Sequence, residues 1–541
     1  MERFRKRFKT IQWSGLWLVC ASLFVGSGLD RFWTDSEMWA VTTSKFYFSE
    51  GKAYFLGIKP FFHGLLWLNY QLSLLFGVYP MDLGRFVWGF LALSVMLLLN
   101  EILKAKRFLF ADRFLFQMLL FGTSFWMYRA TEIRSDLVGT FLFCVAFYVF
   151  VMRDRSTKFQ IFGIATCVLV GLLFTAKSIL VFFPILFIGR FHFNVVKKIW
   201  PLLFLSFVLF GVIFQQTLIE SFTFFIHQIH SSSSIEYFSI LRWRHVLRLV
   251  RENPQVIILI LALLSHLLLN QFWNKDFSNR KYFYGAIYYF LILWLYPDPL
   301  PFFISAYLPL FYLFSFLAMR DWIWQTPYLV KMAISVILFF NCLNLFVKAS
   351  KHSNEIQRTV TNWALQEFRG RSDIVIYDPT GFYAPKNGEH WFIGPSMSNE
   401  YYENILQLVS DQMPEVIFYT QKLIFLEPKI TALLRERYFR WAPSVYLLTR
   451  QVKDLSFKSC AELQKDLNEK LFKGRFSEQN EFSFFVQLEG EDFGYGSVNQ
   501  FSEICKLIQK DEIQKLYVFA TKPPSRPVEN FVELFRYDPY F

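Results

Sequence analysis

The stretch Thr34-Asp35-Ser36-Glu37-Met38-Trp39-Ala40 comes just after Ile11 to Leu29, the first apolar run long enough to cross a membrane. Two carboxylates, Asp35 and Glu37, therefore lie at the outer mouth of a predicted first span. Carboxylates are costly near lipid and are found there mainly for function. The basic segment Met1 to Lys9 resembles the start of a signal peptide, but the apolar run is long for one and no clear cleavage site follows. We predict a retained span with a cytoplasmic N-terminus.

The composition indicates a membrane domain followed by a soluble tail. Of the 541 residues, 54% are hydrophobic and 18% are charged, and nearly all long apolar runs lie within residues 1–350. Residues 351–541 have the composition of an ordinary soluble protein. The net charge is +13, and much of it falls in short segments between apolar runs. That distribution orients membrane proteins, so we expect no nucleic-acid partner.

Apolar runs of about spanning length occur eleven times in the first 350 residues. They cover residues 11–29, 82–103, 113–129, 136–152, 159–175, 177–190, 199–217, 253–271, 282–296, 301–319 and 328–347. With the N-terminus inside, the short connections between spans that fall in the cytoplasm are the basic ones, as the positive-inside rule requires. They are Lys104–Arg107, Arg153–Lys158, Arg190–Lys198, Asn274–Lys281 and Arg320-Asp321. An odd number of spans then places the C-terminal region outside. The exception is Arg242 to Arg251, a basic stretch on the outer face that indicates either a miscounted span or an anion-binding segment.

The first outer loop, residues 30–81, is long. Its apolar part, Pro60 to Gly77, is interrupted by His63 and Asn69. We predict two interfacial helices in this loop instead of a span, because a further span would put the basic connections on the outer face.

The tail is predicted to hold two small α/β domains, residues 351–450 and 451–541, because strand and helix patterns alternate along it. The expected strands are 373–378, 414–419, 444–448, 482–487 and 515–520, and the expected helices are 401–412, 430–438, 460–472 and 501–510. Cys460 and Cys505 can pair if this region lies outside the cytoplasm.

The order of motifs resembles the GT-C superfamily of membrane glycosyltransferases, and within it the branch of protein O-mannosyltransferases and lipid A aminoarabinose transferases. That branch carries an Asp-Glu-x-x-Tyr-Ala type motif, Lys-Pro-Pro-aromatic, Arg-Leu, Ala-Arg-x-Asp and Leu-Thr-Lys-Gly. The corresponding stretches here are Asp35-Ser36-Glu37-Met38-Trp39-Ala40, Lys59-Pro60-Phe61-Phe62, Gly84-Arg85-Phe86, Ile133-Arg134-Ser135-Asp136 and Phe174-Thr175-Ala176-Lys177-Ser178. The likeness covers the first 190 residues, and the rest only in layout. Glu37 is shifted by one position from the family's second acid, and Ile58 stands where relatives often have an acid, so we assign no metal site.

The resemblance implies a mainly α membrane protein: a GT-C-like bundle of about eleven transmembrane helices with interfacial helices on the outer face, followed by the soluble α/β region. It also implies inverting transfer of a sugar from a polyprenyl-phosphate donor to a hydroxyl of an envelope glycan, lipid or protein, with no required cofactor and a divalent cation left open. Asp35 is the expected general base, with Glu37 in reserve. The expected ligands of the lipid phosphate are Lys59, Arg85, Arg134, Lys177, Arg242 and Arg244, with Asp136 orienting Arg134 and with His63 and Arg248 as weaker candidates.

Simpler interpretations stay open for these residues. Asp35 can cap a helix that begins at Ser36, Lys59 can extend to the lipid headgroups, and Arg134 with Asp136 can form a local ion pair. For the whole chain the alternatives are a flippase for lipid-linked saccharides and a non-catalytic envelope scaffold. No half-to-half similarity of the kind found in transporters is visible. We expect a bacterial inner-membrane protein in contact with membrane lipids.

Overall fold

The structure is a computed structural model. It describes residues 2–31, 33–50, 59–151, 157–175, 178–188, 247, 250–273, 279–295, 301–351, 353–368, 374–378, 382, 388–389, 399–418, 429–442, 445–452, 459–474, 482–488 and 494–520. The chain forms two compact units. One consists of Met1–Trp33 and Thr43–Asn354, and the other of Thr34–Thr42 and Glu355–Phe541.

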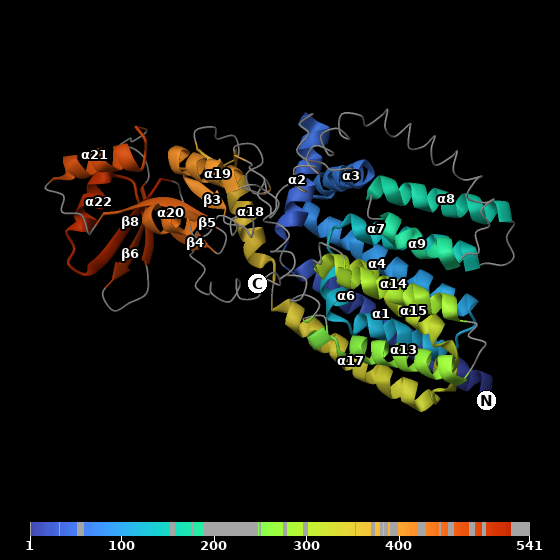
Figure 1. Ribbon diagram of the computed structural model, residues 1–541. Helices are drawn as coiled ribbons and strands as arrows, with labels where there is room; N and C mark the ends of the chain where they lie inside the picture. Colours follow the sequence, from blue (N-terminus) through green and yellow to red (C-terminus); the bar gives the residue numbers. More distant parts are fainter. Residues whose placement is uncertain are drawn as a thin grey trace. The chain divides into compact units, whose positions relative to one another are not determined.

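The N-terminal unit is built from helices that run largely alongside one another (Figure 1). The described helices are α1 (Glu2–Asp30), α2 (Asp35–Glu50, whose first turns group with the other unit), α3 (Pro60–Phe76), α4 (Pro80–Ala105), α5 (Phe110–Phe121), α6 (Ser124–Arg129), α7 (Ser135–Val151), α8 (Thr157–Phe174), α9 (Ser178–Ile188), α13 (Pro254–Trp273), α14 (Arg280–Leu295), α15 (Pro301–Ala318), α16 (Arg320–Gln325) and α17 (Tyr328–Ser350). α1 packs against α4 and α17, α4 also packs against α7, and α14 packs against α15.

Helices occupy ten of the eleven apolar runs that the sequence predicts, and the run 199–217 lies outside the described residues. Among the described residues, two helices, α4 and α17, are long and apolar enough to cross a membrane by length and composition, and five shorter apolar helical segments accompany them. The count of eleven spans therefore stays a prediction. In the described part of the first outer loop, α2 and α3 are helices, and their predicted position at the membrane surface stays a prediction.

The predicted run 113–129 is broken into α5 and α6 at Gly122 and Thr123, and neighbouring helices satisfy the exposed backbone groups. The carbonyl oxygen of Gly122 accepts hydrogen bonds from Gln255 Nε2 (2.9 Å) and Asn341 Nδ2 (2.6 Å). The amide of Ser124 donates to Asn253 Oδ1 over 2.7 Å. A backbone break inside an apolar bundle is stable only when other protein groups supply these partners. The side-chain amides of Asn253, Gln255 and Asn341 thus allow the chain to turn between α5 and α6. This turn positions α6 and the segment that follows it.

A buried ion pair joins α5 to α17. Lys331 Nζ lies 2.5 Å from Asp112 Oδ1, and their side chains are 3% and 0% exposed. Asp112 also accepts the backbone N–H of Leu109 at the start of α5, over 2.9 Å. Because both oxygens of the carboxylate are bound, this charge can be buried without being left uncompensated.

The C-terminal unit contains one eight-stranded sheet. Its strands run in the order β2-β1-β3-β5-β8-β6-β7, and β4 pairs with β5. They are β1 (Ile376–Tyr377), β2 (Gly388–Glu389), β3 (Val416–Phe418), β4 (Tyr438–Ala442), β5 (Val445–Gln451), β6 (Phe482–Leu488), β7 (Gly494–Val498) and β8 (Ile513–Phe519). β1 pairs in parallel with β2 and β3, and the other pairs are antiparallel. The helices are α18 (Glu355–Glu367), α19 (Asn399–Gln412), α20 (Lys429–Arg437), α21 (Cys460–Lys470) and α22 (Phe501–Ile508).

This single sheet differs from the two separate domains, 351–450 and 451–541, that the sequence predicts. The reason is β5: its first half pairs with β3 and β4, and Thr449 to Gln451 pair with β8. One hydrophobic core likewise includes Ile417 and Leu448 from the first half and Leu463, Ile504 and Leu516 from the second. A β-strand has two edges, and the pattern of one strand does not reveal that both edges are used within one domain.

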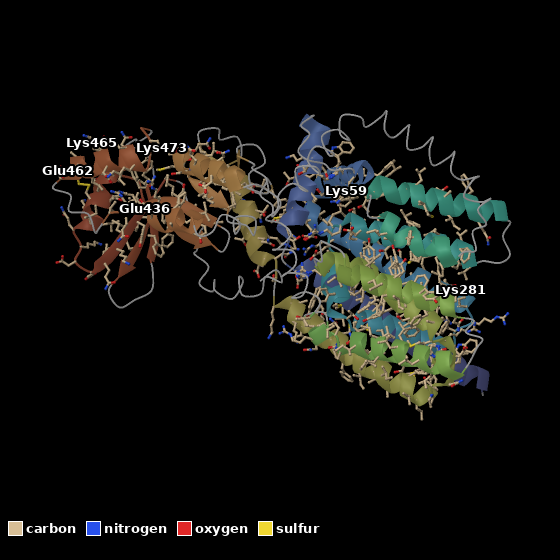
Figure 2. All side chains as sticks on the ribbon, viewed as in Figure 1. Lys59, Lys281, Glu436, Glu462, Lys465 and Lys473 are labelled. Atoms are coloured by element: carbon tan, nitrogen blue, oxygen red, sulfur yellow. A yellow bond between two sulfur atoms is a disulfide. The ribbon has the colours of Figure 1, made fainter. Side chains whose placement is uncertain are left out.

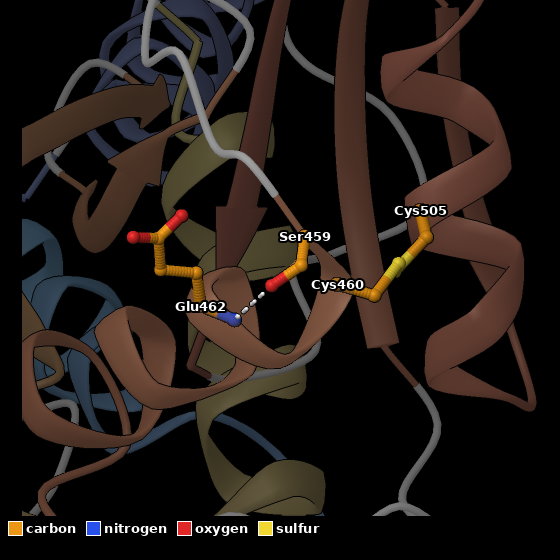
Figure 3. Close-up of a disulfide and its surroundings, with 4 residues drawn as sticks. All are labelled: Ser459, Cys460, Glu462 and Cys505. Atoms are coloured by element: carbon orange, nitrogen blue, oxygen red, sulfur yellow. Dashed lines mark hydrogen bonds between the residues drawn. A yellow bond between two sulfur atoms is a disulfide. The ribbon is translucent and has the colours of Figure 1, made fainter.

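Cys460 and Cys505 form a disulfide between α21 and α22 (Figure 3), with their Cα atoms 6.0 Å apart. Ser459 is the N-cap of α21, and its hydroxyl accepts the backbone N–H of Glu462 over 3.3 Å (Figure 3). The cap and the covalent bond thus hold the same end of α21.

Candidate functional site

The segment between α6 and α7 carries the densest buried charge among the described residues of the N-terminal unit. It runs Arg129-Ala130-Thr131-Glu132-Ile133-Arg134 and leads into Ser135 and Asp136 at the start of α7. The indole N–H of Trp88, on α4, donates to the carbonyl oxygen of Arg134 over 2.8 Å. This bond fixes the backbone from which the Arg134 side chain extends.

Two glycines allow the segment to approach α1 and α4 closely. A Cβ atom at Gly28 on α1 would lie 2.4 Å from Thr131 Oγ1 and 2.6 Å from Thr131 Cβ. A Cβ atom at Gly84 on α4 would lie 2.4 Å from Ile133 Cδ1. Only glycine, which has no Cβ atom, lets the side chains of Thr131 and Ile133 lie this close to the backbones of α1 and α4. The position of the segment is therefore set by contacts with two helices that are distant in sequence.

Glu132 gathers three arginines from different elements. Its Oε1 accepts a hydrogen bond from Nη1 of Arg129, the last residue of α6, and lies 3.8 Å from Nη1 of Arg31, which follows α1. Its Oε2 lies 3.8 Å from Nε of Arg134. The Glu132 side chain is 1% exposed, and those of Arg129, Arg31 and Arg134 are 3%, 9% and 17% exposed. Arg134 is thus the member of this arginine cluster that a ligand can reach most easily.

Arg31 is held from several directions. Its Nη1 donates to the carbonyl oxygen of Tyr128, and its backbone forms an isolated β-bridge with Ser353. Arg85, on α4, donates from Nη1 to the carbonyl oxygens of Gly28 (3.0 Å) and Arg31 (2.5 Å). Carbonyls at a helix C-terminus lack partners within the helix and attract cations. Arg85 therefore stabilises the end of α1 and the backbone of Arg31.

Asp136 is 5% exposed and is the second residue of α7. The sequence predicts that Asp136 orients Arg134, whereas the structure pairs Arg134 with Glu132. Among the described residues, Oδ1 of Asp136 has no hydrogen-bond partner. A buried carboxylate oxygen of this kind is costly, which keeps Asp136 a candidate for contact with a ligand.

Of the two acids in the Asp35–Ala40 motif, the structure describes the side-chain contacts of Glu37 only. Asp35 is the first residue of α2, and its side chain lies outside the described part of the chain. Glu37 is fully buried, and its Oε2 accepts both the backbone N–H of Thr34 (3.0 Å) and the Thr34 hydroxyl (2.9 Å). The amide of Glu37 in turn donates to the Thr34 carbonyl oxygen over 3.0 Å. Thr34 and Glu37 therefore cap the start of α2.

Lys59 lies directly before α3, which begins at Pro60 (Figure 2), and its side chain is half-buried. His63, one turn into α3, is buried, and its Nδ1 lies 2.7 Å from the hydroxyl of Ser44 on α2. This hydrogen bond joins the two helices of the first outer loop. The remaining predicted ligands, Lys177, Arg242, Arg244 and Arg248, lie outside the described residues.

The sequence-based prediction missed Arg31, Arg129 and Glu132. The signal for the last two was the sequence Arg129-Ala130-Thr131-Glu132-Ile133-Arg134, which places three charges within six residues between apolar runs. Arg31 has no such signal, because only the packing of α1 brings it to Glu132. In the described part of the chain, no group of three or more His, Cys, Asp or Glu side chains is arranged to hold a metal ion.

The fold of this chain is similar to that of the solved protein ArnT, in agreement with the GT-C-like fold that the sequence predicts. ArnT from Cupriavidus metallidurans, solved with undecaprenyl phosphate bound, is similar with a TM-score of 0.53 and 13% identity over 81% of this chain and 97% of that one. The apo form of the same enzyme gives a TM-score of 0.49 and 13% identity over 78% and 95%. No protein-family model matches the chain. No curated protein matches it by sequence.

Proposed function

We propose that this chain is an integral membrane glycosyltransferase that moves a sugar from a polyprenyl-phosphate carrier to a hydroxyl group of an envelope acceptor. The observation that carries the proposal is the arginine cluster around Glu132, in a fold shared with an enzyme that was solved with undecaprenyl phosphate. Arginine binds phosphate through several donors in fixed geometry, so a cluster of this kind suits a lipid phosphate.

In the proposed reaction, the acceptor oxygen attacks the anomeric carbon while the bond from that carbon to the phosphate oxygen breaks, with inversion. Asp35 takes the proton of the acceptor hydroxyl. The carrier leaves as its phosphate, and Arg134 and Lys59 stabilise the negative charge that develops on it. Their partial exposure makes them the best described candidates for direct contact. Lys177, Arg242 and Arg244 remain proposed phosphate ligands.

The contacts of Glu37 and Arg85 favour supporting roles. Glu37 is occupied with Thr34, and Arg85 with the end of α1. Asp35 is therefore preferred as the base. We propose that transfer requires no cofactor, so activity should persist when a chelator is added to the transfer assay. Loss of activity with the chelator, restored by a divalent cation, would show that a metal ion is needed.

The proposed location is the bacterial inner membrane, with the C-terminal unit outside the cytoplasm. The disulfide between Cys460 and Cys505 supports this orientation, because disulfides persist in oxidising compartments.

The test is mass spectrometry of polyprenyl-phosphate lipids and envelope glycans in cells that carry the wild type, a deletion or Asp35→Asn. We expect one polyprenyl-phosphate sugar to accumulate and one glycan mass to disappear in both the deletion and Asp35→Asn cells. Asp321→Asn is the control, since Asp321 lies in the first turn of α16, in a connection predicted to be cytoplasmic, and should behave as the wild type.

A deletion that alters the lipids, together with an Asp35→Asn variant that acts as the wild type, would refute the role of Asp35. It would favour the flippase. A deletion without any effect on lipids or glycans would favour the scaffold.

A further inference from the structure

We infer that Glu132 is a positioning residue that holds Arg134 where its guanidinium can bind the phosphate of the lipid carrier, an inference that rests on the proposed function. Glu132 is the acid to which Arg31, Arg129 and Arg134 all come within ion-pair distance. The two carboxylate oxygens of Glu132 contact different arginines: Oε1 is the oxygen nearest Arg129 and Arg31, and Oε2 is the oxygen nearest Arg134.

The exposure of the three arginines gives them different roles. Arg129 and Arg31 are more buried, at 3% and 9% exposure, and both lie within ion-pair distance of Glu132 Oε1. Arg134 is the outermost at 17%, and Glu132 approaches the Nε edge of its guanidinium. Nε and Nη2 of Arg134 are both buried atoms, so a phosphate would approach the guanidinium from the side of Nη1.

Electrostatics explains why the carboxylate matters for binding. Three guanidinium groups around one point repel one another strongly at low dielectric. Glu132 offsets that repulsion, and without it the least buried arginine is the one free to move toward water. Arg134 is that arginine, so loss of Glu132 should displace the group that binds phosphate. A glutamate that served stability alone would affect folding and leave phosphate binding to folded protein unchanged.

The experiment measures binding of undecaprenyl phosphate to the purified full-length chain in lipid nanodiscs. The proteins are the wild type, Glu132→Gln, Arg134→Gln and the double variant. We expect Glu132→Gln to weaken binding roughly ten-fold or more, and the double variant to bind no worse than Arg134→Gln alone. Asp112→Asn is the matched control: it breaks another buried ion pair of the same unit, with Lys331, and should keep wild-type binding when folded.

Wild-type binding by Glu132→Gln would overturn the inference while leaving the proposed function intact. So would losses that multiply in the double variant, because Glu132 would then not act through Arg134. If the wild type fails to bind undecaprenyl phosphate, the proposed carrier and this inference fall together. If Glu132→Gln does not fold, Glu132→Asp takes its place, and its smaller loss should vanish in the Arg134→Gln background.

Discussion

At the scale of the residue, the structure describes the contacts of Glu37, one of the two acids in the first motif. Asp35 and Glu37 are both compatible with general-base chemistry in the sequence, and both follow the first apolar run. The structure gives Glu37 two hydrogen bonds from Thr34 and complete burial. The side-chain type therefore identifies the candidate general bases, and the hydrogen bonds of Glu37 to Thr34 assign Glu37 a structural role.

We expect Glu37→Ala to lower the free energy of unfolding by about 1 kcal/mol, because α2 loses its capping interaction. Glu37→Gln should recover part of that loss, since its amide oxygen can still accept from Thr34. Thermal unfolding of the purified chain measures both variants. Transfer activity should survive in Glu37→Gln, and its abolition in a folded protein would return Glu37 to the list of catalytic candidates.

A second residue-scale prediction concerns Asp466 on α21. Burial alone would raise its pKa, but hydrogen bonds from Arg450 (2.8 Å) and Lys470 (2.6 Å) hold the pKa of Asp466 below its usual value. A depressed folded-state pKa stabilises the protein above the pKa of the unfolded chain, and this contribution is lost as the pH falls through the folded-state value.

Asp466→Asn should therefore reduce stability at pH 7 by about 0.5–1 kcal/mol and weaken the loss of stability between about pH 5 and 3. The free energy of unfolding of the C-terminal unit is measured at each pH by urea unfolding of the full-length chain, with limited proteolysis as the probe. Glu469→Gln on the same helix is the control, because its partner Lys465 is 3.9 Å away and both side chains are exposed. Equal pH dependence in the wild type and Asp466→Asn would contradict the prediction.

At the scale of the element, α1 approaches the segment after α6 closely, at Gly28. Thr131 is β-branched and lies against Gly28, so neither side can yield easily. The same segment carries Glu132 and Arg134, and a shift of its backbone moves both side chains.

Gly28→Ala should destabilise the chain by about 1–3 kcal/mol through overpacking. Gly15→Ala, in the same helix, is the control: a Cβ atom there meets nothing within 4 Å, so alanine should be neutral or slightly stabilising. Thermal unfolding and binding of undecaprenyl phosphate measure both. Similar stability of the two variants would show that Thr131 can move aside.

At the scale of the whole molecule, the redox state of the Cys460–Cys505 disulfide tests the predicted membrane topology, because it reports the compartment in which the C-terminal unit lies. Cys460 and Cys505 are 45 residues apart, and Cys20, Cys144, Cys167 and Cys342 are free and buried. If eleven spans follow a cytoplasmic N-terminus, the disulfide lies in an oxidising compartment.

We expect Cys460 and Cys505 to resist alkylation in intact cells until a reductant is added. Reduction should then cost the C-terminal unit about 3–4 kcal/mol of stability, because a closed loop of this length is released in the unfolded chain. Mass spectrometry of alkylated peptides gives the redox state, and Cys460→Ser and Cys505→Ser should show the same loss of stability. Alkylation without a reductant would place the unit in the cytoplasm and contradict the span count.

By itself, the sequence determined where most of the described helices form, because apolar runs and the helix patterns of the tail are local properties, but it did not predict the break between α5 and α6. It also determined which residue types are available near the site, including Arg85, Arg134 and Asp136. Only the tertiary structure decided that Glu132 is the partner of three arginines, that Arg85 serves the end of α1, and that β5 joins both halves of the tail in one sheet. Each of these depends on contacts between segments far apart in the chain, such as α1 with the segment after α6. Such contacts are set by packing between elements, which no local pattern encodes.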